Sequence, residues 1–260
     1  MENRLVAVIT GAAGGIGQLV AKYFATNNKF GDVVIVDSLA KKEELATIAG
    51  ALNSGVFPAE ASVRDLTCDV VDNYKCENLV TNILINWGRI DVLVNAAGIA
   101  QEFGPLVKTD FEKARRVMNV NFWGTLNMCR AVLPHMRISG HGRIVNVSSI
   151  AAQRGDPGNL VYAASKAAIE SLTKTLAHEA PFDKGGSPLN ITVNAVAPGI
   201  IDTPMANLLS EKVKEGYRRM NPTGRTGRPE EVAKVIHWLA TEAPQYVNGE
   251  IIRVDGGFLA

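Results

Sequence analysis

The stretch VITGAAGGIGQLVAKYFA, residues 8–25, decides how the rest of the chain is interpreted. A short apolar run rich in β-branched residues leads into a glycine-rich turn, and apolar residues at helical spacing follow. Gly11, Gly15 and Gly17 would let the backbone turn sharply and approach a pyrophosphate, at which the amides of the following helix would point. Ile16 lies in the same turn and is a further candidate contact. Glycines also close many such turns for steric reasons alone, so this motif needs support from elsewhere.

The pattern of strand, turn and helix repeats along the chain. Apolar runs predict strands at 5–10, 32–37, 63–70, 90–98, 142–149, 190–199 and 250–257. Helical spacing between them predicts helices that include 16–26, 73–87, 111–138, 161–179 and 230–240. Runs that are apolar throughout indicate strands buried on both faces, and alternation with helices favours a parallel sheet with right-handed crossovers. We therefore expect one α/β domain over 1–260 with a doubly wound sheet, and a lid or binding loop at about 200–228.

Composition excludes several classes of function. The 27 basic and 26 acidic residues leave a formal net charge of +1, which provides no basic field for nucleic acid or an anionic membrane. No apolar stretch reaches the length of a membrane span, and the run near the N-terminus is too short for the core of a signal peptide. The three cysteines and four histidines lack metal-site spacing, so we expect no metal. These features predict a reduced, cytoplasmic protein.

Polar residues at the ends of the next strands extend the candidate cofactor site. Asp37 lies twenty residues past Gly17, where a carboxylate can accept hydrogen bonds from an adenosine ribose and would repel a 2′-phosphate. Because no Lys or Arg follows at 38–40, the sequence favours NAD over NADP, although Asp37 could instead cap the next helix. Candidate contacts after the third and fourth strands, each of which could equally form a turn, are Asp69 and Val70 for the adenine and Asn95, Ala96 and Gly98 beneath the cofactor.

The segment VYAASKAAIESL, residues 161–172, carries Tyr162 and Lys166 four positions apart. On a helix this spacing brings the two side chains to one face. A phenol has an ordinary pKa of about 10, and a neighbouring ammonium favours the phenolate. A decrease of roughly three units in pKa would correspond to about 4 kcal/mol. We therefore expect Tyr162 to be a general acid and base, the alternative being a solvated helix face.

With these residues in place, the sequence resembles the short-chain dehydrogenase/reductase family over nearly its whole length. The TGxxxGxG turn appears at 10–17, NAAG at 95–98, and the YxxxK pair at Tyr162 and Lys166. The family's active-site asparagine matches Asn121 in NVNFWGT, and its serine matches Ser149 in NVSS. The PG motif and its downstream threonine match Pro198, Gly199 and Thr203. The resemblance implies a Rossmann sheet of about seven strands and interconversion of an alcohol and a carbonyl with a nicotinamide cofactor.

The resemblance also implies roles for the matched residues. Ser149 would donate to the substrate oxygen, Lys166 would reach the nicotinamide ribose, and Asn121 would complete a proton path through its backbone carbonyl or a held water. Thr203 would bond the nicotinamide carboxamide. Each of these residues also has a structural alternative. Asn121 could pin a helix kink, and Thr203 could cap a helix. Ser148 and Ser149 are neighbours and either could be an N-cap, although the family motif favours Ser149 as the active-site serine.

Substrate contacts are expected from the loops at 99–108, 150–160 and 200–225, where Arg154 or Glu102 could meet a polar group. The favoured function is an NAD-dependent dehydrogenase of a small or medium secondary alcohol or ketone. The alternative is a reductase of 3-oxoacyl thioesters on acyl carrier protein or CoA, with basic residues that could meet an acidic carrier, namely Arg218, Arg219, Arg225 and Arg228. A catalytically silent binding protein is disfavoured because both Tyr162 and Lys166 are present. The family also suggests a homo-oligomer, a tetramer or a dimer, with a homotetramer paired through the helices at 111–138 and 161–179.

Overall fold

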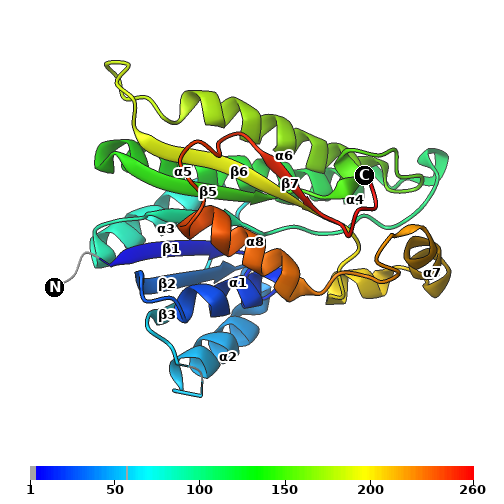
Figure 1. The fold of residues 1–260 in the computed structure, drawn as a ribbon, viewed down its shortest axis with the longest axis horizontal. Coiled ribbons are helices and arrows are strands. Elements are labelled where there is room, and N and C mark those ends of the chain that lie inside the picture. The colour runs from blue at the N-terminus through cyan, green and yellow to red at the C-terminus, as the bar shows by residue number, and fades with distance from the viewer. Residues whose placement is uncertain (1–3, 57) are drawn as a thin grey trace.

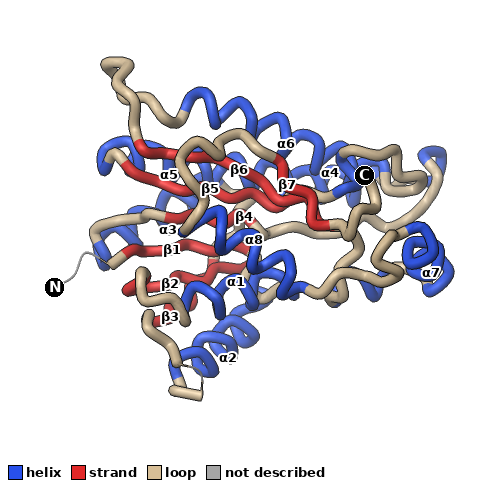
Figure 2. Tube along the Cα trace, viewed as in Figure 1, coloured by secondary structure: helices blue, strands red, loops and turns tan. Residues whose placement is uncertain are grey.

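A computed structural model describes residues 4–56 and 58–260 and contains one seven-stranded sheet. The strands are all parallel and lie in the order β3-β2-β1-β4-β5-β6-β7. Their bounds are β1 Leu5–Thr10, β2 Phe30–Asp37, β3 Ser62–Thr67, β4 Val92–Asn95, β5 His141–Val147, β6 Asn190–Pro198 and β7 Ile251–Val254. The predicted doubly wound parallel sheet is confirmed (Figures 1 and 2).

Helices cover both faces of the sheet. One face packs against α1 Gly15–Ala25, α2 Lys42–Asn53 and α8 Pro229–Thr241, and the other packs mainly against α3 Asn73–Trp87, α5 Gly124–Ser139 and α6 Leu160–Glu179. In β1, Ala7 and Ile9 face the first set of helices while Val6 and Val8 face the second, and all four are buried. This two-sided burial explains why the strand runs are apolar throughout rather than alternating.

Two helical regions differ from the sequence-based expectation. The helix predicted at 111–138 consists of α4 Phe111–Met118, a π-helical turn η3 Asn119–Trp123, and α5. The lid segment 200–228 contains a helix of its own, α7 Glu211–Met220, which follows the short 3₁₀ turn η5 Pro204–Leu208. The spacing of Val213, Tyr217 and Met220 after an N-cap at Ser210 is the helical signal that could have located α7.

The order of the strands determines where a ligand can bind. Chain connections run outward in opposite directions from β1 and β4, so the loops that follow these two strands diverge and leave a crevice at their carboxyl ends. The segment with α7 lies beyond the same edge of the sheet, at the right of Figure 1. Among the described helices, none is both long and apolar enough to cross a membrane.

Candidate active site

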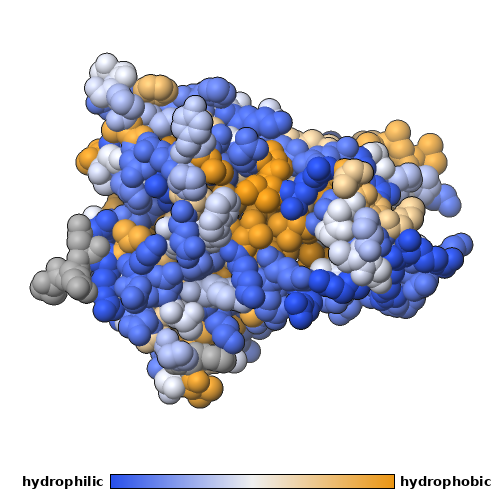
Figure 3. Space-filling view, viewed as in Figure 1, coloured by the Kyte–Doolittle hydropathy of each residue, from blue (hydrophilic) through white to orange (hydrophobic). Residues whose placement is uncertain are grey.

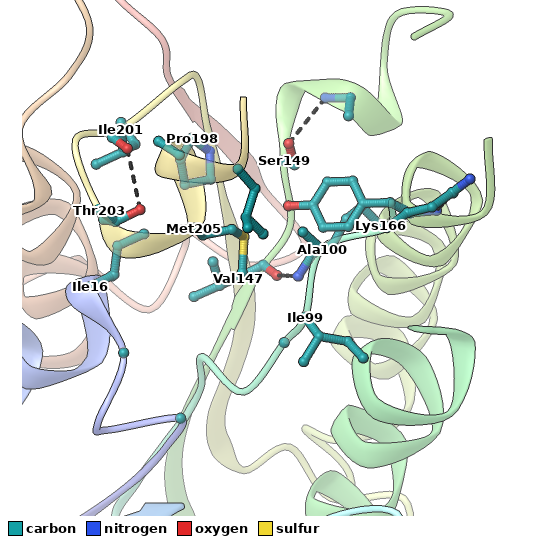
Figure 4. Close-up of a pocket in the computed structure, with 18 of the residues that line it drawn as sticks. Ile16, Ile99, Ala100, Val147, Ser149, Lys166, Pro198, Ile201, Thr203 and Met205 are labelled. Atoms are coloured by element: carbon teal, nitrogen blue, oxygen red, sulfur yellow. Dashed lines mark hydrogen bonds between the residues drawn. The ribbon is translucent and has the colours of Figure 1, made fainter. Parts of the chain in front are cut away.

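A cleft with a volume of about 1220 Å³ occupies this edge of the sheet. Its walls come from the turns after the strands, from the lid segment and from Phe258 near the C-terminus. Most of the predicted site residues line it: Gly11, Gly15, Ile16, Gly17, Asp37, Asp69, Val70, Ala96, Gly98, Ser149, Tyr162, Lys166, Pro198, Gly199 and Thr203. Figure 4 shows Ile16 and Thr203 on one side of this space and Ser149 and Lys166 on the other.

The glycine turn is packed too closely to accept side chains. Gly11 has a φ of +66°, and a Cβ added there would lie 2.5 Å from the backbone nitrogen of Ala97. A Cβ on Gly17 would lie 2.2 Å from the carbonyl oxygen of Gly11. The first turn of α1 also carries no acidic side chain, so no carboxylate of that turn competes for its free amides. These features fit the close approach of a pyrophosphate.

Asp37 is held at the edge of the glycine turn. Its Oδ2 accepts a hydrogen bond from the backbone nitrogen of Ala13 at 3.1 Å, and its Oδ1 accepts one from Ser38 at 2.8 Å. The residue ends β2, and its carboxylate does not cap α2, whose N-cap is Lys41. The ribose-binding position predicted for Asp37 is therefore geometrically available, while the helix-capping alternative is not observed.

Asn95 does not reach the cleft, although its sequence motif suggested a cofactor contact. Its Nδ2 donates to Asn146 Oδ1 at 2.9 Å and to Cys129 Sγ at 3.3 Å. Asn95 is the last residue of β4, and this side chain points into the core between β4 and α5, whereas Ala96 and Gly98 beyond the strand line the cleft. The amide joins β4 to the neighbouring strand β5 beneath the site.

Tyr162 and Lys166 lie on the same face of α6, as predicted. The ammonium of Lys166 lies 5.7 Å from the centroid of the Tyr162 ring and donates to the carbonyl of Val147 at 2.8 Å (Figure 4). Lys166 is only 4% exposed. Burial lowers the pKa of this ammonium to about 8.

The phenol of Tyr162 behaves differently from the sequence-based expectation. Burial raises its pKa above the ordinary value, the nearby Asp156 acts in the same direction, and only a hydrogen bond with Ser149 opposes them. Lys166 is not among the groups that shift this pKa in the ligand-free chain, and a lowering by Lys166 together with a bound cofactor stays a prediction. The ammonium is bonded to a strand carbonyl and lies over the ring instead of pairing with the phenol oxygen.

The two adjacent serines are distinguished by their partners. The Ser148 hydroxyl lies 3.2 Å from the Lys166 carbonyl and 3.0 Å from Glu170 Oε1, so it ties β5 to α6. Ser149 Oγ accepts a hydrogen bond from the backbone nitrogen of Ala151 at 3.2 Å (Figure 4), and its own proton is directed to the cleft side, where Tyr162 is its hydrogen-bond partner. Of the two, Ser149 is the serine available to a substrate.

Asn121 is fully buried in the π-helical turn and does not line the cleft. Its Oδ1 accepts from the backbone nitrogen of Ile99 at 2.8 Å, and its Nδ2 donates to the Ile99 carbonyl at 3.1 Å and to Ser165 Oγ at 3.0 Å. The side chain thus pins the loop after β4 to α6 at an irregular helical turn, as the kink alternative predicted. Its backbone carbonyl, which accepts from Thr125 Oγ1 at 2.8 Å, remains the candidate member of a proton path.

Thr203 does not cap η5, although it stands at the N-cap position. Its hydroxyl donates to the Ile201 carbonyl at 3.3 Å (Figure 4). Its methyl group approaches the turn so closely that a Cβ on Gly15 would lie 2.6 Å from it. The threonine thus lies directly against the glycine turn.

Gln101 is a site residue that the sequence did not indicate. It is buried, lines the cleft, and its Oε1 accepts from the backbone nitrogens of Val161 at 2.7 Å and Tyr162 at 3.0 Å. These two bonds cap the N-terminus of α6 in place of Asn159, whose side chain makes no capping bond. Because Gln101 lies sixty residues before the helix, no local signal could have revealed it.

The lid is attached to the C-terminal segment through Tyr217. Its ring stacks on Phe258 at a centroid distance of 4.5 Å, and its hydroxyl donates to the carbonyl of Asp255 at 3.1 Å. The same hydroxyl lies against Gly199, where an added Cβ would come within 2.2 Å of it. The position of α7 is therefore coupled to the PG motif at the floor of the cleft.

Glu102 can be removed from the candidate substrate contacts. It forms an exposed ion pair with Lys113 at 2.7 Å and is not part of the cleft wall. Arg154, in contrast, lines the cleft. Within the described part of the chain, no group of three His, Cys, Asp or Glu side chains could hold a metal ion.

Comparison with known proteins extends the similarity to nearly the whole chain. Residues 11–259 match the family model described as enoyl-(acyl carrier protein) reductase. A 3-oxoacyl-[acyl-carrier-protein] reductase of Thermotoga maritima is 41% identical over 257 residues, covering 98% of this chain and 97% of the relative. The cis-4-hydroxycyclohexanecarboxylate dehydrogenase of Sinomonas cyclohexanicum is 37% identical over 257 residues, covering 98% and 96%.

A solved structure agrees with these relatives. The structure described as ElxO with NADP bound superimposes with a TM-score of 0.85 at 31% identity, covering 98% of this chain and 99% of the other. The fold, the ordered motifs and these similarities together confirm the family suggested by the sequence. The chain belongs to the short-chain dehydrogenase/reductase family and is an oxidoreductase that uses a nicotinamide cofactor to interconvert alcohol and carbonyl groups.

Proposed function

We propose that Tyr162 is the general acid and base of an NAD(H)-dependent enzyme that interconverts a secondary alcohol and a ketone. One observation carries this proposal. Tyr162, Lys166 and Ser149, from α6 and the end of β5, converge on the same cleft whose other end contains the glycine turn and Asp37. A silent binding protein has no need for a protonated phenol, a buried ammonium and a serine hydroxyl beside that phenol at one site.

The cleft residues fit a nicotinamide cofactor. The crowded glycine turn suits the pyrophosphate, Asp37 suits the adenosine ribose, and Asp69 and Val70 suit the adenine. At the other end, Lys166 would bond the nicotinamide ribose, and Thr203 with Pro198 and Gly199 would hold the carboxamide. When bound, the cofactor supplies or accepts the hydride.

The chain's own residues provide the proton. During reduction the carbonyl oxygen must gain a proton, and burial raises the pKa of Tyr162 so that the phenol retains one at neutral pH. Ser149 can donate a hydrogen bond to the same oxygen and orient it. Lys166, whose pKa burial lowers to about 8, is acidic enough to help restore the proton. Asn121 would extend this route to solvent through its carbonyl. These features suit Tyr162 to the role of proton donor in the reduction of a ketone.

The preference for NAD rests on Asp37. Its carboxylate is fixed by two backbone amides, so it cannot easily turn away from a 2′-phosphate, which it would repel. Lys41, a nearby cation on the cleft wall, already pairs with Glu44 at 2.7 Å. The similar ElxO structure is described with NADP bound, so the preference proposed here depends on this chain's own residues.

A second candidate function is reduction of 3-oxoacyl thioesters, which the name of the Thermotoga maritima relative supports. The four arginines considered for binding an acidic carrier give it less support. Arg218 and Arg219 lie 3.3 Å and 3.6 Å from Glu215, and Arg225 and Arg228 lie 2.7 Å and 3.7 Å from Glu231. Each of these arginines therefore already has a glutamate partner, although two glutamates serve four arginines and a net positive charge remains. The two candidates differ in whether acetoacetyl-CoA is turned over.

We also propose that the chain forms one domain and assembles into a homotetramer. Exposed apolar side chains lie on the helices expected to pair, including Phe111 at 67%, Trp123 at 48% and Ile138 at 85% exposure. Figure 3 shows a further hydrophobic area between α8 and the edge strand β7. A cytoplasmic location remains a prediction from the sequence.

Light scattering tests the assembly. We expect a particle four times the mass of the 27.9 kDa chain. A particle with the mass of a single chain at micromolar concentration would contradict the tetramer without affecting the catalytic proposal.

Replacement of the phenol tests the acid and base. Tyr162→Phe should reduce kcat for ketone reduction by about 10²- to 10⁴-fold, because no group remains to donate the proton. Binding of NADH, followed by fluorescence, should change little. In the wild type, kcat/KM for reduction should fall as pH rises through the raised pKa of Tyr162, whereas oxidation should become faster. Unchanged turnover in Tyr162→Phe would contradict the role of Tyr162 as the general acid and base.

The buried ammonium should decrease the stability of the ligand-free protein. Its pKa falls from 10.5 to about 8 on folding, so the penalty is complete below about pH 8 and disappears as the pH rises toward 10.5. Lys166→Met should therefore increase the free energy of unfolding at pH 7 by about 1–3 kcal/mol, while abolishing most activity. Urea denaturation between pH 7 and 10 should show this difference narrowing with pH. A difference in the free energy of unfolding that stays constant from pH 7 to 10 would contradict the lowered pKa of Lys166.

Removal of the Asp37 carboxylate tests the cofactor preference. Asp37→Ala should lower kcat/KM with NADH by about 10- to 100-fold, because hydrogen bonds to the ribose are lost. It should raise kcat/KM with NADPH, because the repulsion of the 2′-phosphate is removed. Asp65→Ala, an exposed acid on β3 outside the cleft, serves as the control. A wild-type enzyme that prefers NADPH would overturn this part of the proposal.

A further inference from the structure

Arg154 is a cation of the cleft that the proposed mechanism does not use. It lies in the loop 150–159, which runs from Ser149 to the start of α6, so it stands between the two residues expected to meet the substrate oxygen. The side chain is half-buried and lines the cleft. Its position is therefore at the substrate end of the site.

No acid of the described chain forms an ion pair with Arg154 within 4.0 Å. Asp156, two residues away, instead accepts from Asn159 Nδ2 at 3.0 Å. The arginines of the lid differ, since Arg218 and Arg219 both have glutamate partners. A partly buried guanidinium without a carboxylate loses hydration without gaining a counter-charge.

An aromatic pair holds Arg154 in position. Its guanidinium carbon lies 4.8 Å from the centroid of Phe258, whose ring stacks on Tyr217 of the lid. An aromatic ring attracts the cation but offers no lone pair. The fork of N–H donors that suits a carboxylate is therefore open to the cleft, where a ligand can reach it.

The surroundings indicate the rest of the ligand. Apolar side chains from four segments share this cleft, including Phe103, Ile150, Met205 and Leu209. A carboxylate on Arg154 would lie beside Phe258, and the apolar body of the substrate would occupy the apolar part of the cleft.

We propose that Arg154 binds a carboxylate carried by the substrate, so that the preferred substrate is a keto acid, or the matching hydroxy acid, with an apolar body. This inference rests on the proposed alcohol and ketone chemistry and adds the chemical class of the substrate. Arg154 would act as a specificity residue that contacts the carboxylate, while Tyr162 and Ser149 contact the reacting oxygen.

Matched pairs of substrates test the proposal. The probes are levulinate and 4-oxocyclohexanecarboxylate, each compared with its uncharged methyl ester, with acetoacetyl-CoA as a thioester. The wild type should turn over the acids with kcat/KM about 10- to 100-fold higher than the esters, as a charge-assisted pair predicts. Arg154→Gln should remove this difference by lowering activity toward the acids only, and Arg154→Lys should retain part of it. Arg64→Gln, an exposed cation on β3 outside the cleft, should leave the ratio of acid to ester activity unchanged.

A binding measurement separates this inference from the catalytic proposal. In a Tyr162→Phe background with NADH, levulinate should raise Tm, and addition of Arg154→Gln should abolish that rise. Equal kcat/KM for acids and esters in the wild type, or equal losses for both in Arg154→Gln, would overturn the role of Arg154 while leaving the oxidoreductase chemistry intact. Preference for acetoacetyl-CoA over both acids would also overturn it. Failure of every ketone would remove the proposed function itself.

Discussion

The hydrogen bond from the Lys166 ammonium to the Val147 carbonyl fastens the catalytic helix to the end of the central sheet. Both groups are removed from water, so the bond is formed where a misplaced charge would be expensive. It fixes α6 relative to β5 and so relates Tyr162 to Ser149, which come from these two elements. The geometry of the site thus depends on a charge that lowers the stability of the fold that holds it.

Other contacts repeat this fastening around the cleft. Asn121 and Gln101 both connect the loop after β4 with α6, one through Ser165 and Ile99 and the other through the first amides of the helix. A Cβ on Gly98 would lie 3.3 Å from Asn121 Oδ1 and 3.4 Å from Lys166 Nζ, so the loop passes directly over both. A rigid substrate-side wall follows from these bonds.

The fold and most of the site could be predicted because their signals are local. The apolar runs mark strands buried on two faces, and short motifs mark the turns that meet at one edge of a parallel sheet. Prediction failed where the partner of a side chain is distant in sequence, and where the direction in which a side chain leaves its strand decides what it contacts. Alternation along β4 turns Asn95 into the core, and the cap on α6 comes from Gln101 in another loop. The raised pKa of Tyr162 could not be predicted either. The spacing of the two residues shows that Lys166 is near, but it does not show how deeply the phenol is buried or that the ammonium donates to the Val147 carbonyl.

The cap supplied by Gln101 has a consequence for how such an enzyme can diversify. In many catalysts, peripheral loops vary independently of the reactive groups, which lets specificity change while chemistry is preserved. Here the segment after β4 also completes the end of the helix that bears the phenol. Recombination that exchanges this segment alone would remove Gln101, and with it the acceptor that caps the N-terminus of α6. The lid is attached through Tyr217, which involves no residue of α6. New specificities should therefore arise more readily from changes in the lid.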